Sequence, residues 1–334
     1  MRRIKIAQIG INQYSHGPEL FYTMKGYPEI FDLVGYAIVE NERETCKDKI
    51  AQYYEGYPEL SLEEILNDPT IEAVTVETDE IHLLKYAQMA ADAGKHIHME
   101  KPGSPSLKDF ERLIDTMRKT KKVFHMGYMF RYNPMVAKTI DRAKKGEFGH
   151  VFSVEAQMNR YDRRPSREWL SCFPGGMMFY LGSNLIDVIM QVQGEPSEVI
   201  PLNTSTGIDG VASEDLGFAV LRYPNAVSVV RTIATDVGGL RQIVVCGEKR
   251  TVEIKPIEEY EKHPIIFSST ANEAFLTEEG KVERVKETSE LFGRYYAMIT
   301  AFAEMVRGEK ENPYTLDYEL ALFRTIMKCC GALA

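Results

Sequence analysis

Short apolar runs alternate with amphipathic stretches over the first part of the chain. Strands are predicted at Ile4–Ile9, Leu33–Val39 and Ile71–Val76, and in KHIHMEKP at 95–102, which ends in a proline. Helices are predicted between them at Pro18–Lys25, Glu42–Tyr53, Ser61–Leu66, Leu83–Ala93 and Leu107–Lys119. This alternation predicts a parallel sheet with helices on both faces, whose ligands bind at the carboxyl ends of the strands.

The pattern changes after Val123. Period-two stretches predict strands at Val151–Met158, Leu216–Leu221, Val227–Thr235, Gln242–Val245 and Thr251–Ile254. Helices are predicted at Met135–Lys145, Ser289–Arg307 and Leu316–Leu333, and the charged segment Glu278–Glu290 is predicted to be exposed. We therefore expect an α/β domain with a doubly wound parallel sheet at 1–123 and an α+β domain with a mainly antiparallel sheet at 124–334.

Charge and composition exclude several classes of partner. The net charge of −9 and the pI near 5.5 argue against nucleic acid and anionic membrane surfaces as partners. The N-terminus predicts a strand rather than a signal peptide, and no apolar run is long enough to cross a bilayer. The five cysteines are scattered without metal or redox spacing. We therefore expect a cytoplasmic protein with reduced thiols.

The first strand-to-helix turn contains candidate cofactor residues. A dinucleotide fold places glycines here so that the backbone approaches the pyrophosphate at a helix N-terminus. Gly10 fits the first glycine, while Asn12, which tolerates left-handed angles, and Ser15 stand at the second and third. Glu40 ends the second predicted strand, where an acid accepts a ribose 2′-hydroxyl, favouring NAD without excluding NADP. An ordinary turn and a solvated loop acid are the alternatives.

Titratable side chains follow two more strands at the same edge of the sheet. The Lys101 ammonium is placed to hydrogen-bond a ribose or substrate hydroxyl, or to exchange a proton if burial lowers its pKa. A surface lysine is the alternative. His82 has a possible site role and an equally plausible role at a helix terminus. His96 and His98 are spaced i, i+2 without a third ligand nearby, so we expect no metal.

Residues 174–187, PGGMMFYLGSNLID, predict a helix opened by two glycines. Tyr180, Asn184 and Asp187 are spaced by four and three residues, so their polar groups share one face of the helix. This face either lines a substrate pocket or forms a polar patch satisfied within a domain interface.

Two aromatic residues upstream of this helix are weaker substrate candidates. Tyr161 lies in an arginine-rich loop that would suit a substrate with hydroxyl or carboxylate groups, although such a run is more often solvated. Trp169, the single tryptophan, either stacks on a sugar ring or packs the loop.

The order of these motifs resembles a known family. The glycine-bearing turn, AGKHIHMEKP, GYMFRYNP and the GG-opened helix ending in LID resemble the glucose–fructose oxidoreductase / inositol dehydrogenase / MocA (Gfo/Idh/MocA) family over nearly the whole chain. The resemblance implies an N-terminal Rossmann domain and a C-terminal domain with an open-faced sheet. It also implies a nicotinamide cofactor, a sugar, inositol or related polyol substrate, and homo-dimers or homo-tetramers formed through the open sheet.

The resemblance assigns site residues by position. Lys101 matches the lysine beside the nicotinamide and substrate, and Tyr180 and Asn184 replace the aspartate and histidine of the family's Gly-Gly…Asp-x-Gly-x-His pattern. The family histidine is the acid/base, whereas an amide holds a hydroxyl without titrating near neutrality. We therefore expect catalytic roles for Lys101, Tyr180 and Asn184. The expected cofactor contacts are Gly10, Asn12, Gln13, Glu40, Glu77, His82, Glu100 and Lys101, and the expected substrate contacts are Arg131, Tyr161, Trp169, Tyr180 and Asn184.

Three functions remain open at this point. The first is an NAD(P)-dependent oxidoreductase that acts on CH–OH groups of a sugar or polyol, with Lys101 and Tyr180 handling the proton. The second is a cofactor- and ligand-binding protein with little or no catalysis, because Asn184 replaces the acid/base. The third keeps NAD tightly bound for transient oxidation, so that net redox is invisible.

Overall fold

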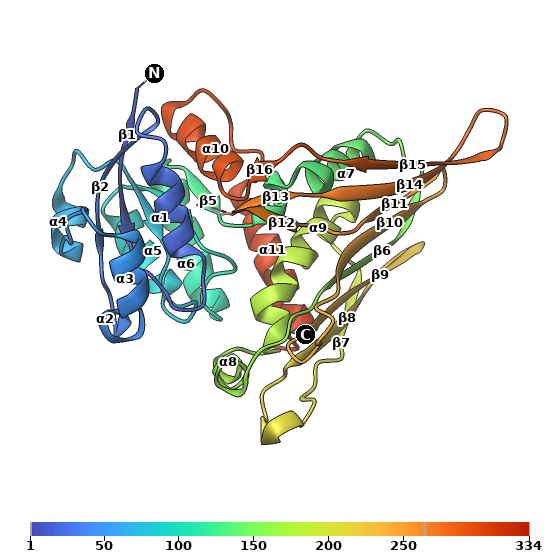
Figure 1. Ribbon diagram of the computed structural model, residues 1–334, viewed down its shortest axis with the longest axis horizontal. Helices are drawn as coiled ribbons and strands as arrows, with labels where there is room; N and C mark the ends of the chain where they lie inside the picture. Colours follow the sequence, from blue (N-terminus) through green and yellow to red (C-terminus); the bar gives the residue numbers. More distant parts are fainter. Residues whose placement is uncertain (1, 263–264, 334) are drawn as a thin grey trace. The chain divides into compact units, whose positions relative to one another are not determined.

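A computed structural model describes residues 2–262 and 265–333, which fold into two compact units (Figure 1). The first unit joins Met1–Tyr128 to Tyr295–Leu320, and the second joins Met129–Arg294 to Ala321–Ala334. This division differs from the predicted boundary after Val123 for two reasons. Phe124–Met126 forms β5, the last strand of the first sheet, and the chain returns to the first unit as α10 (Tyr296–Arg307).

The first unit is built on a parallel sheet of five strands, in the order β2-β1-β3-β4-β5. Its other strands are β1 (Ile4–Ile9), β2 (Phe31–Ala37), β3 (Ala73–Val76) and β4 (His96–Met99). From β1 the chain moves outward to β2 and later returns to the opposite side at β3. The order therefore reverses between β1 and β3, which is where such sheets bind their ligands.

Helices cover both faces of this sheet, as predicted. They are α1 (Gly17–Lys25), α2 (Glu42–Thr45), α3 (Lys47–Tyr53), α4 (Leu62–Asn67), α5 (Leu83–Asp92) and α6 (Leu107–Thr120). Because β1→β2 and β3→β4 run in opposite directions across the sheet, right-handed crossovers place α1 and α5 on opposite faces (Figure 1). The ring of Phe302 in α10 lies against His98 and His125 of β4 and β5.

The second unit contains a sheet of eight strands, in the order β15-β14-β11-β10-β6-β9-β8-β7. The bounds are β6 (Val151–Met158), β7 (Glu198–Pro201), β8 (Leu216–Tyr223), β9 (Ala226–Ile233), β10 (Arg241–Gly247), β11 (Arg250–Ile254), β14 (Thr270–Leu276) and β15 (Val282–Thr288). Its described neighbours pair antiparallel, except for the parallel pair β6 and β9. A smaller sheet contains β12 (Glu259–Lys262), β13 (Ile266–Ser268) and β16 (Phe292–Gly293).

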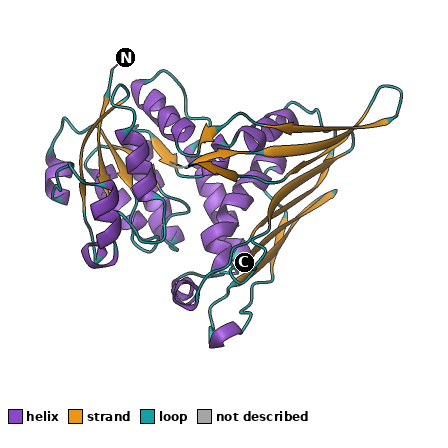
Figure 2. Ribbon diagram, viewed as in Figure 1, coloured by secondary structure: helices purple, strands orange, loops and turns teal. Residues whose placement is uncertain are grey.

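Helices of the second unit pack against one face of the large sheet (Figure 2). They include α7 (Pro134–Lys144), a π-helical turn η3 (Met178–Gly182) and α9 (Ser183–Gln193). Shorter helices are η1 (Met129–Tyr132), α8 (Arg164–Trp169), η2 (Leu170–Cys172) and η4 (Ile208–Gly210), and α11 (Leu316–Cys329) ends in this unit. Along β6, Val154 and Ala156 are buried while Glu155 is exposed on the other face. The predicted fold class is confirmed.

Near the C-terminus, one predicted helix differs from the structure and one segment predicted to be exposed is confirmed as exposed along its strand. The helix expected from Ser289 starts only at Tyr296, because β16 precedes it. The exposed segment Glu278–Glu290 contains the edge strand β15, all of whose residues are exposed. Over 2–262 and 265–333, no helix combines the length and the hydropathy needed to cross a membrane.

Candidate functional site

The first strand-to-helix turn has the tight geometry that a dinucleotide site requires. Gly10 has a φ of +83°, and a Cβ at this position would lie 2.6 Å from the Cβ of Thr78, so glycine is required. Asn12 adopts the predicted left-handed conformation, with a φ of 54°. Its Nδ2 donates to the Thr78 carbonyl and to Oε2 of Glu80, both at 3.1 Å, and its Oδ1 accepts from the Tyr14 amide at 2.8 Å. The asparagine thus joins the turn to the loop after β3.

The start of α1 is also shaped by close packing. A Cβ at Gly17 would lie 2.8 Å from the Cβ of Glu77, and the N-cap residue His16 makes no side-chain hydrogen bond to the first turn. The Gly17 amide donates to the Ser15 hydroxyl at 3.3 Å, and a helix N-terminus whose N-cap side chain makes no capping bond is suited to a pyrophosphate. The residues present therefore fit the phosphates of a nicotinamide dinucleotide.

Two charged residues that sequence reasoning missed hold this turn in place. Glu42 is buried and accepts from the amides of Asn12 at 3.3 Å and Val39 at 3.1 Å, and burial raises the pKa of its carboxyl group. Lys49 Nζ donates to the carbonyl groups of Asn12, Gln13 and Ser15 at 3.3, 3.0 and 3.4 Å. Their partners are backbone atoms from elsewhere in the chain, so no sequence spacing indicates either role.

Glu40 lies beyond the end of β2, in a left-handed conformation with a φ of 51°. Its Oε1 accepts from Lys85 Nζ at 2.6 Å and from the Tyr86 hydroxyl at 2.7 Å. The Lys85 hydrogen bond is the largest influence that lowers the pKa of Glu40. His82 Nδ1 lies 3.8 Å from the same oxygen, at the N-cap of α5. The predicted ribose acceptor is therefore an ionised carboxylate near neutral pH, not a freely solvated one.

Buried carboxyl groups surround a buried lysine where β3 and β4 end. Glu77, Glu80, Glu100 and Lys101 are at most 7% exposed, and Lys101 Nζ lies 3.5 Å from Glu100 Oε1. Burial is the largest cause that raises the pKa of Glu80 to about 8 and the pKa of Glu77 well above its ordinary range. The Oε1 atoms of Glu77 and Glu80 have no hydrogen-bond partner in the described chain. The alternative of a surface lysine is excluded.

The two histidines of β4 have separate partners. His96 Nδ1 accepts from the Val123 amide at 3.0 Å, while His98 Nδ1 lies 2.7 Å from His125 Nδ1. Burial lowers the pKa of His98 to about 3, so this ring is neutral. The described residues contain no group of three or more histidine, cysteine or acidic side chains that could hold a metal.

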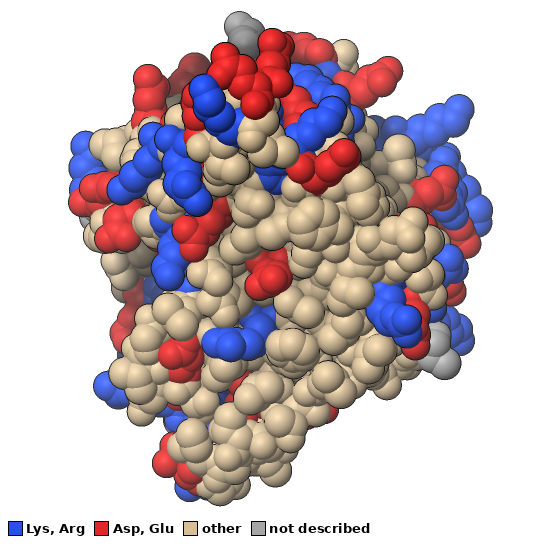
Figure 3. Space-filling model, turned by 90° about the vertical axis from the view of Figure 1, so that its right-hand side faces the viewer, with Lys and Arg blue, Asp and Glu red and all other residues tan. Residues whose placement is uncertain are grey.

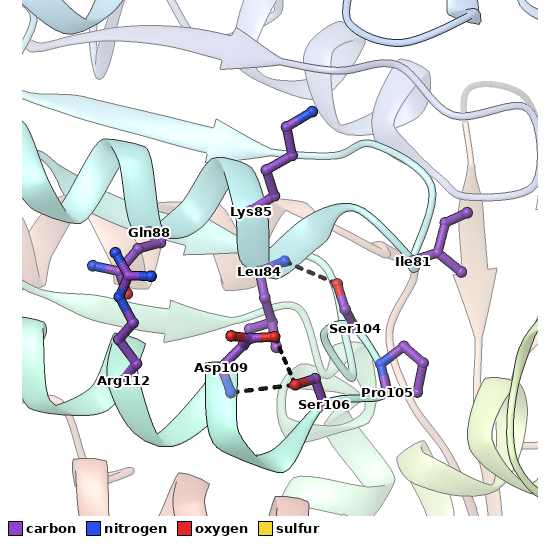
Figure 4. A pocket seen from close by; sticks show the side chains of 9 residues that line it. All are labelled: Ile81, Leu84, Lys85, Gln88, Ser104, Pro105, Ser106, Asp109 and Arg112. Atoms are coloured by element: carbon purple, nitrogen blue, oxygen red, sulfur yellow. Dashed lines mark hydrogen bonds between the residues drawn. The ribbon is translucent and has the colours of Figure 1, made fainter.

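A surface pocket of about 440 Å³ also lies in the first unit, between α5 and α6 (Figure 4). The Ser104 hydroxyl accepts from the Leu84 amide at 3.0 Å, and the Ser106 hydroxyl accepts from the Asp109 amide at 3.3 Å. These hydroxyl groups cap the two helices. The lining includes no predicted site residue, so we assign the pocket no part in the reaction.

In the second unit, the helix with the predicted polar face begins at Met178 and not at the glycines. Gly176 has a φ of 44°, and a Cβ there would lie 2.4 Å from the carbonyl oxygen of Glu214. A π-helical turn then precedes α9, a feature frequent at functional sites. Asn184 is 1% exposed, and neither its Oδ1 nor its Nδ2 has a hydrogen-bond partner in the described chain. Such a buried amide requires an explanation, and a substrate hydroxyl would satisfy it.

Asp187, the third member of the polar face, forms a buried ion pair. Its Oδ1 accepts a hydrogen bond from Arg131 Nη2 at 2.8 Å. Its Oδ2 accepts from Arg131 Nε at 3.1 Å and from Gln191 Nε2 at 2.9 Å. The side chains of Arg131 and Asp187 are 0% exposed. Arg131 was predicted to touch substrate, but its guanidinium has no exposed surface here. We treat it as a residue that positions α9.

The two aromatic candidates differ in their surroundings. The Trp169 ring meets Tyr180 edge-on with centroids 5.1 Å apart, and Phe173 in the same way at 4.8 Å. Trp169 thus supports the Tyr180 side of the polar face. Tyr161 is 65% exposed, and its backbone forms an isolated bridge with Thr235. A substrate contact for either residue stays a prediction.

The parallel sheet, the glycine-dependent turn and the buried lysine at the carboxyl edge are features of a dinucleotide-binding Rossmann domain. Residues 4–128 match the oxidoreductase family with an NAD-binding Rossmann fold, and residues 136–253 match the Gfo/Idh/MocA C-terminal domain. The chain belongs to the Gfo/Idh/MocA family of oxidoreductases, which confirms the resemblance of its motifs.

Individual relatives support this assignment. The chain is 25% identical to an uncharacterised oxidoreductase, ORF334, of Rhizobium meliloti over 66% of each chain. It is 26% identical to myo-inositol 2-dehydrogenase of Thermotoga maritima over 56% of this chain and 57% of that one. The aldose-aldose oxidoreductase of Caulobacter crescentus has the same fold, with a TM-score of 0.81 and 20% identity over 99% and 97% of the two chains. The chain spans 66%, 40% and 56% of the first three curated relatives that it matches.

Proposed function

We propose that the chain is an NAD-dependent oxidoreductase that transfers hydride between nicotinamide and a CH–OH carbon of a sugar, inositol or related polyol. The observation that supports it most is Lys101, which is 6% exposed at the carboxyl edge of the Rossmann sheet. A lysine is costly to bury and is retained there where its charge or its proton is used. Two of the named relatives, a myo-inositol 2-dehydrogenase and an aldose-aldose oxidoreductase, favour this substrate class by their names.

The roles follow from the side chains present. A bound nicotinamide cofactor would supply the acceptor for the hydride of the substrate carbon. Lys101, with Tyr180 as a second candidate, exchanges the proton of the substrate hydroxyl. Asn184 holds a hydroxyl group with its unpartnered amide and does not titrate near neutrality. Gly10, Asn12 and the start of α1 hold the phosphates.

The preference for NAD over NADP is proposed from Glu40. Lys85 and Tyr86 keep this carboxylate ionised after β2. An anion at this place accepts a ribose 2′-hydroxyl and repels a 2′-phosphate. Replacing it in Glu40→Gln is expected to narrow the difference between the Kd values for NAD+ and NADP+.

An assay of NADH formation with a panel of sugars, inositols and related polyols tests the function. Lys101→Met should lower kcat by about 10²- to 10⁴-fold, the usual effect of losing a proton-transfer group. Lys108→Met is the matched control, because Lys108 is an exposed lysine of the same unit. Equal rates for the two variants would contradict the role of Lys101.

The second candidate function is ligand binding with little or no catalysis, which the replacement of the acid/base by Asn184 favours. Asn184→His restores the family residue at this position. If the variant oxidises a panel member that the native chain only binds, the second candidate becomes the better account. Nicotinamide retained through purification, without net turnover, would instead indicate transient oxidation by a tightly held cofactor.

A further inference from the structure

An arginine on the helix-covered face of the large sheet has no acidic partner. Arg241 is the first residue of β10, and the alternation along this strand puts it on the same face as the buried Ile243 and Val245. Its Nε donates to the carbonyl oxygen of Asn159 at 3.3 Å. In the ranges that the structure describes, no carboxylate forms an ion pair with its guanidinium.

The carboxylates around Arg241 already have partners. Asp162 pairs with Arg160 at 2.7 Å, and Glu258 accepts from Arg294 at 2.8 and 2.7 Å. Burial is the largest cause that lowers the pKa of Arg241; the charge of Glu258 opposes it, and the charges of Arg294 and Arg160 act in the same direction as burial. Of these three arginines, Arg241 is the one that forms no ion pair with a described carboxylate.

The Tyr180 side chain belongs to this environment. Its phenol is among the groups that act electrostatically on Arg241, together with Glu258 and the two arginines. The Asn159 amide donates to the Leu240 carbonyl at 2.9 Å, which joins the end of β6 to the start of β10. Arg241 thus lies within electrostatic range of Tyr180, a member of the polar face that includes Asn184.

We propose that Arg241 binds a carboxylate of the substrate, so that within this substrate class the sugar acids, aldonates or uronates, are preferred to neutral sugars. A guanidinium binds a carboxylate through two parallel hydrogen bonds. One unpaired positive charge matches one carboxylate, whereas a phosphate dianion needs a second free cation, and Arg160 and Arg294 are already paired. This inference rests on the proposed function, because it names the substrate of the same site.

The test uses the fluorescence of Trp169, the single tryptophan, which contacts Tyr180. D-Glucuronate, D-galacturonate and D-gluconate are titrated against D-glucose, D-galactose and sorbitol, with the whole chain and with saturating NAD+. At least one acid should bind with a Kd about 10-fold or more below that of its neutral counterpart, the effect of a charged hydrogen bond. Neutral sugars that bind as tightly as the acids would overturn the proposal, as would the absence of binding by any acid.

Arg241→Gln should weaken binding of the preferred acid by about 10- to 100-fold and leave a neutral sugar unchanged. Arg222→Gln is the matched control, because Arg222 is a strand arginine of the same sheet with a 56% exposed side chain. Arg241→Lys keeps the charge without the planar guanidinium, so it should weaken acid binding by an intermediate amount. This variant replaces Arg241→Gln in the test if the glutamine variant does not fold. Unchanged acid binding in both Arg241 variants, or tighter binding of glucose 6-phosphate, would contradict the assignment.

The binding test and the proposed function fail in different ways. Acid binding that depends on Arg241, without NADH formation from any bound acid, would leave the carboxylate site standing and count against hydride transfer. Turnover of neutral polyols with no preference for acids would support hydride transfer and count against the carboxylate site.

Discussion

Glu80 is a carboxyl group that the fold buries completely and that titrates near pH 8. Burial raises the pKa of Glu80 from an ordinary value of 4.5 to about 8, so between pH 4.5 and pH 8 the folded chain binds more protons than the unfolded chain. The free energy of unfolding therefore falls as the pH rises through this range. Glu80→Gln removes the titration. We expect the native Tm without cofactor to fall more between pH 5 and pH 9 than that of the variant, with Glu63→Gln, an exposed acid, behaving as native. Parallel pH profiles for Glu80→Gln and the native chain would contradict this.

Within residues 2–262 and 265–333, Asn184 has two buried polar atoms without hydrogen-bond partners, which is unfavourable for stability. Asn184→Leu should therefore leave the free energy of unfolding unchanged or raise it by about 1 kcal/mol, while ligand binding is lost. Urea unfolding followed by Trp169 fluorescence measures the first effect. A loss of stability above about 2 kcal/mol would show that the amide is structural.

At the residue scale, the sequence predicts what depends on local position. Gly10, Asn12 and Lys101 are recognisable because each follows a strand at a fixed spacing in a parallel sheet. Glu42 and Arg241 are not recognisable from the sequence, because the groups around them come from distant elements that only the fold brings together.

At the element scale, α9 is anchored by the buried pair of Arg131 and Asp187. Asp187→Ala leaves an uncompensated charge in the core, so it should lower the free energy of unfolding by about 3–5 kcal/mol. The double variant Arg131→Met, Asp187→Leu should recover most of this loss, because no buried charge remains. Denaturant unfolding of the native chain, the single variant and the double variant measures the free energy of unfolding of each. An equal loss of this free energy in the single and the double variant would contradict the account.

Element bounds were predictable where periodicity is strong. The strand Val151–Met158 has the predicted bounds, because buried and exposed positions alternate along it. All residues of the edge strand β15, VERVKET, are exposed, so no buried apolar position alternates with a polar one. The period-two pattern that predicts strands is therefore absent there. The π-helical turn at Met178–Gly182 follows Gly176, whose close approach to Glu214 is a long-range contact that sequence does not show.

At the scale of the whole molecule, the open face of the large sheet is the candidate for self-association. Phe218, Val220 and Val229 lie on this face and are partly exposed, and Figure 3 shows a wide surface with few charged side chains. Apolar areas of this kind mark interaction surfaces, so we propose a homo-dimer or homo-tetramer formed here. Val229→Arg should yield monomers in analytical ultracentrifugation, with Val282→Arg on the exposed edge strand as control. A native chain that sediments as a monomer at micromolar concentration would contradict this.

The domain division was predictable only in part. The change from a parallel to an antiparallel pattern is visible near Val123, but the return of Tyr295–Leu320 to the first unit is not. That return is determined by α10, whose Phe302 packs on His98 and His125, histidines with no sequence feature that predicts this contact.

The central claim is that the first unit holds a nicotinamide dinucleotide through the turn at Gly10 and Asn12. Calorimetric titration of the whole chain with NAD+ and NADP+ tests it most directly. The account predicts saturable binding of NAD+ with one site per chain, and weaker binding of NADP+ because of Glu40. No binding of either dinucleotide to a folded chain freed of bound nucleotide would contradict it.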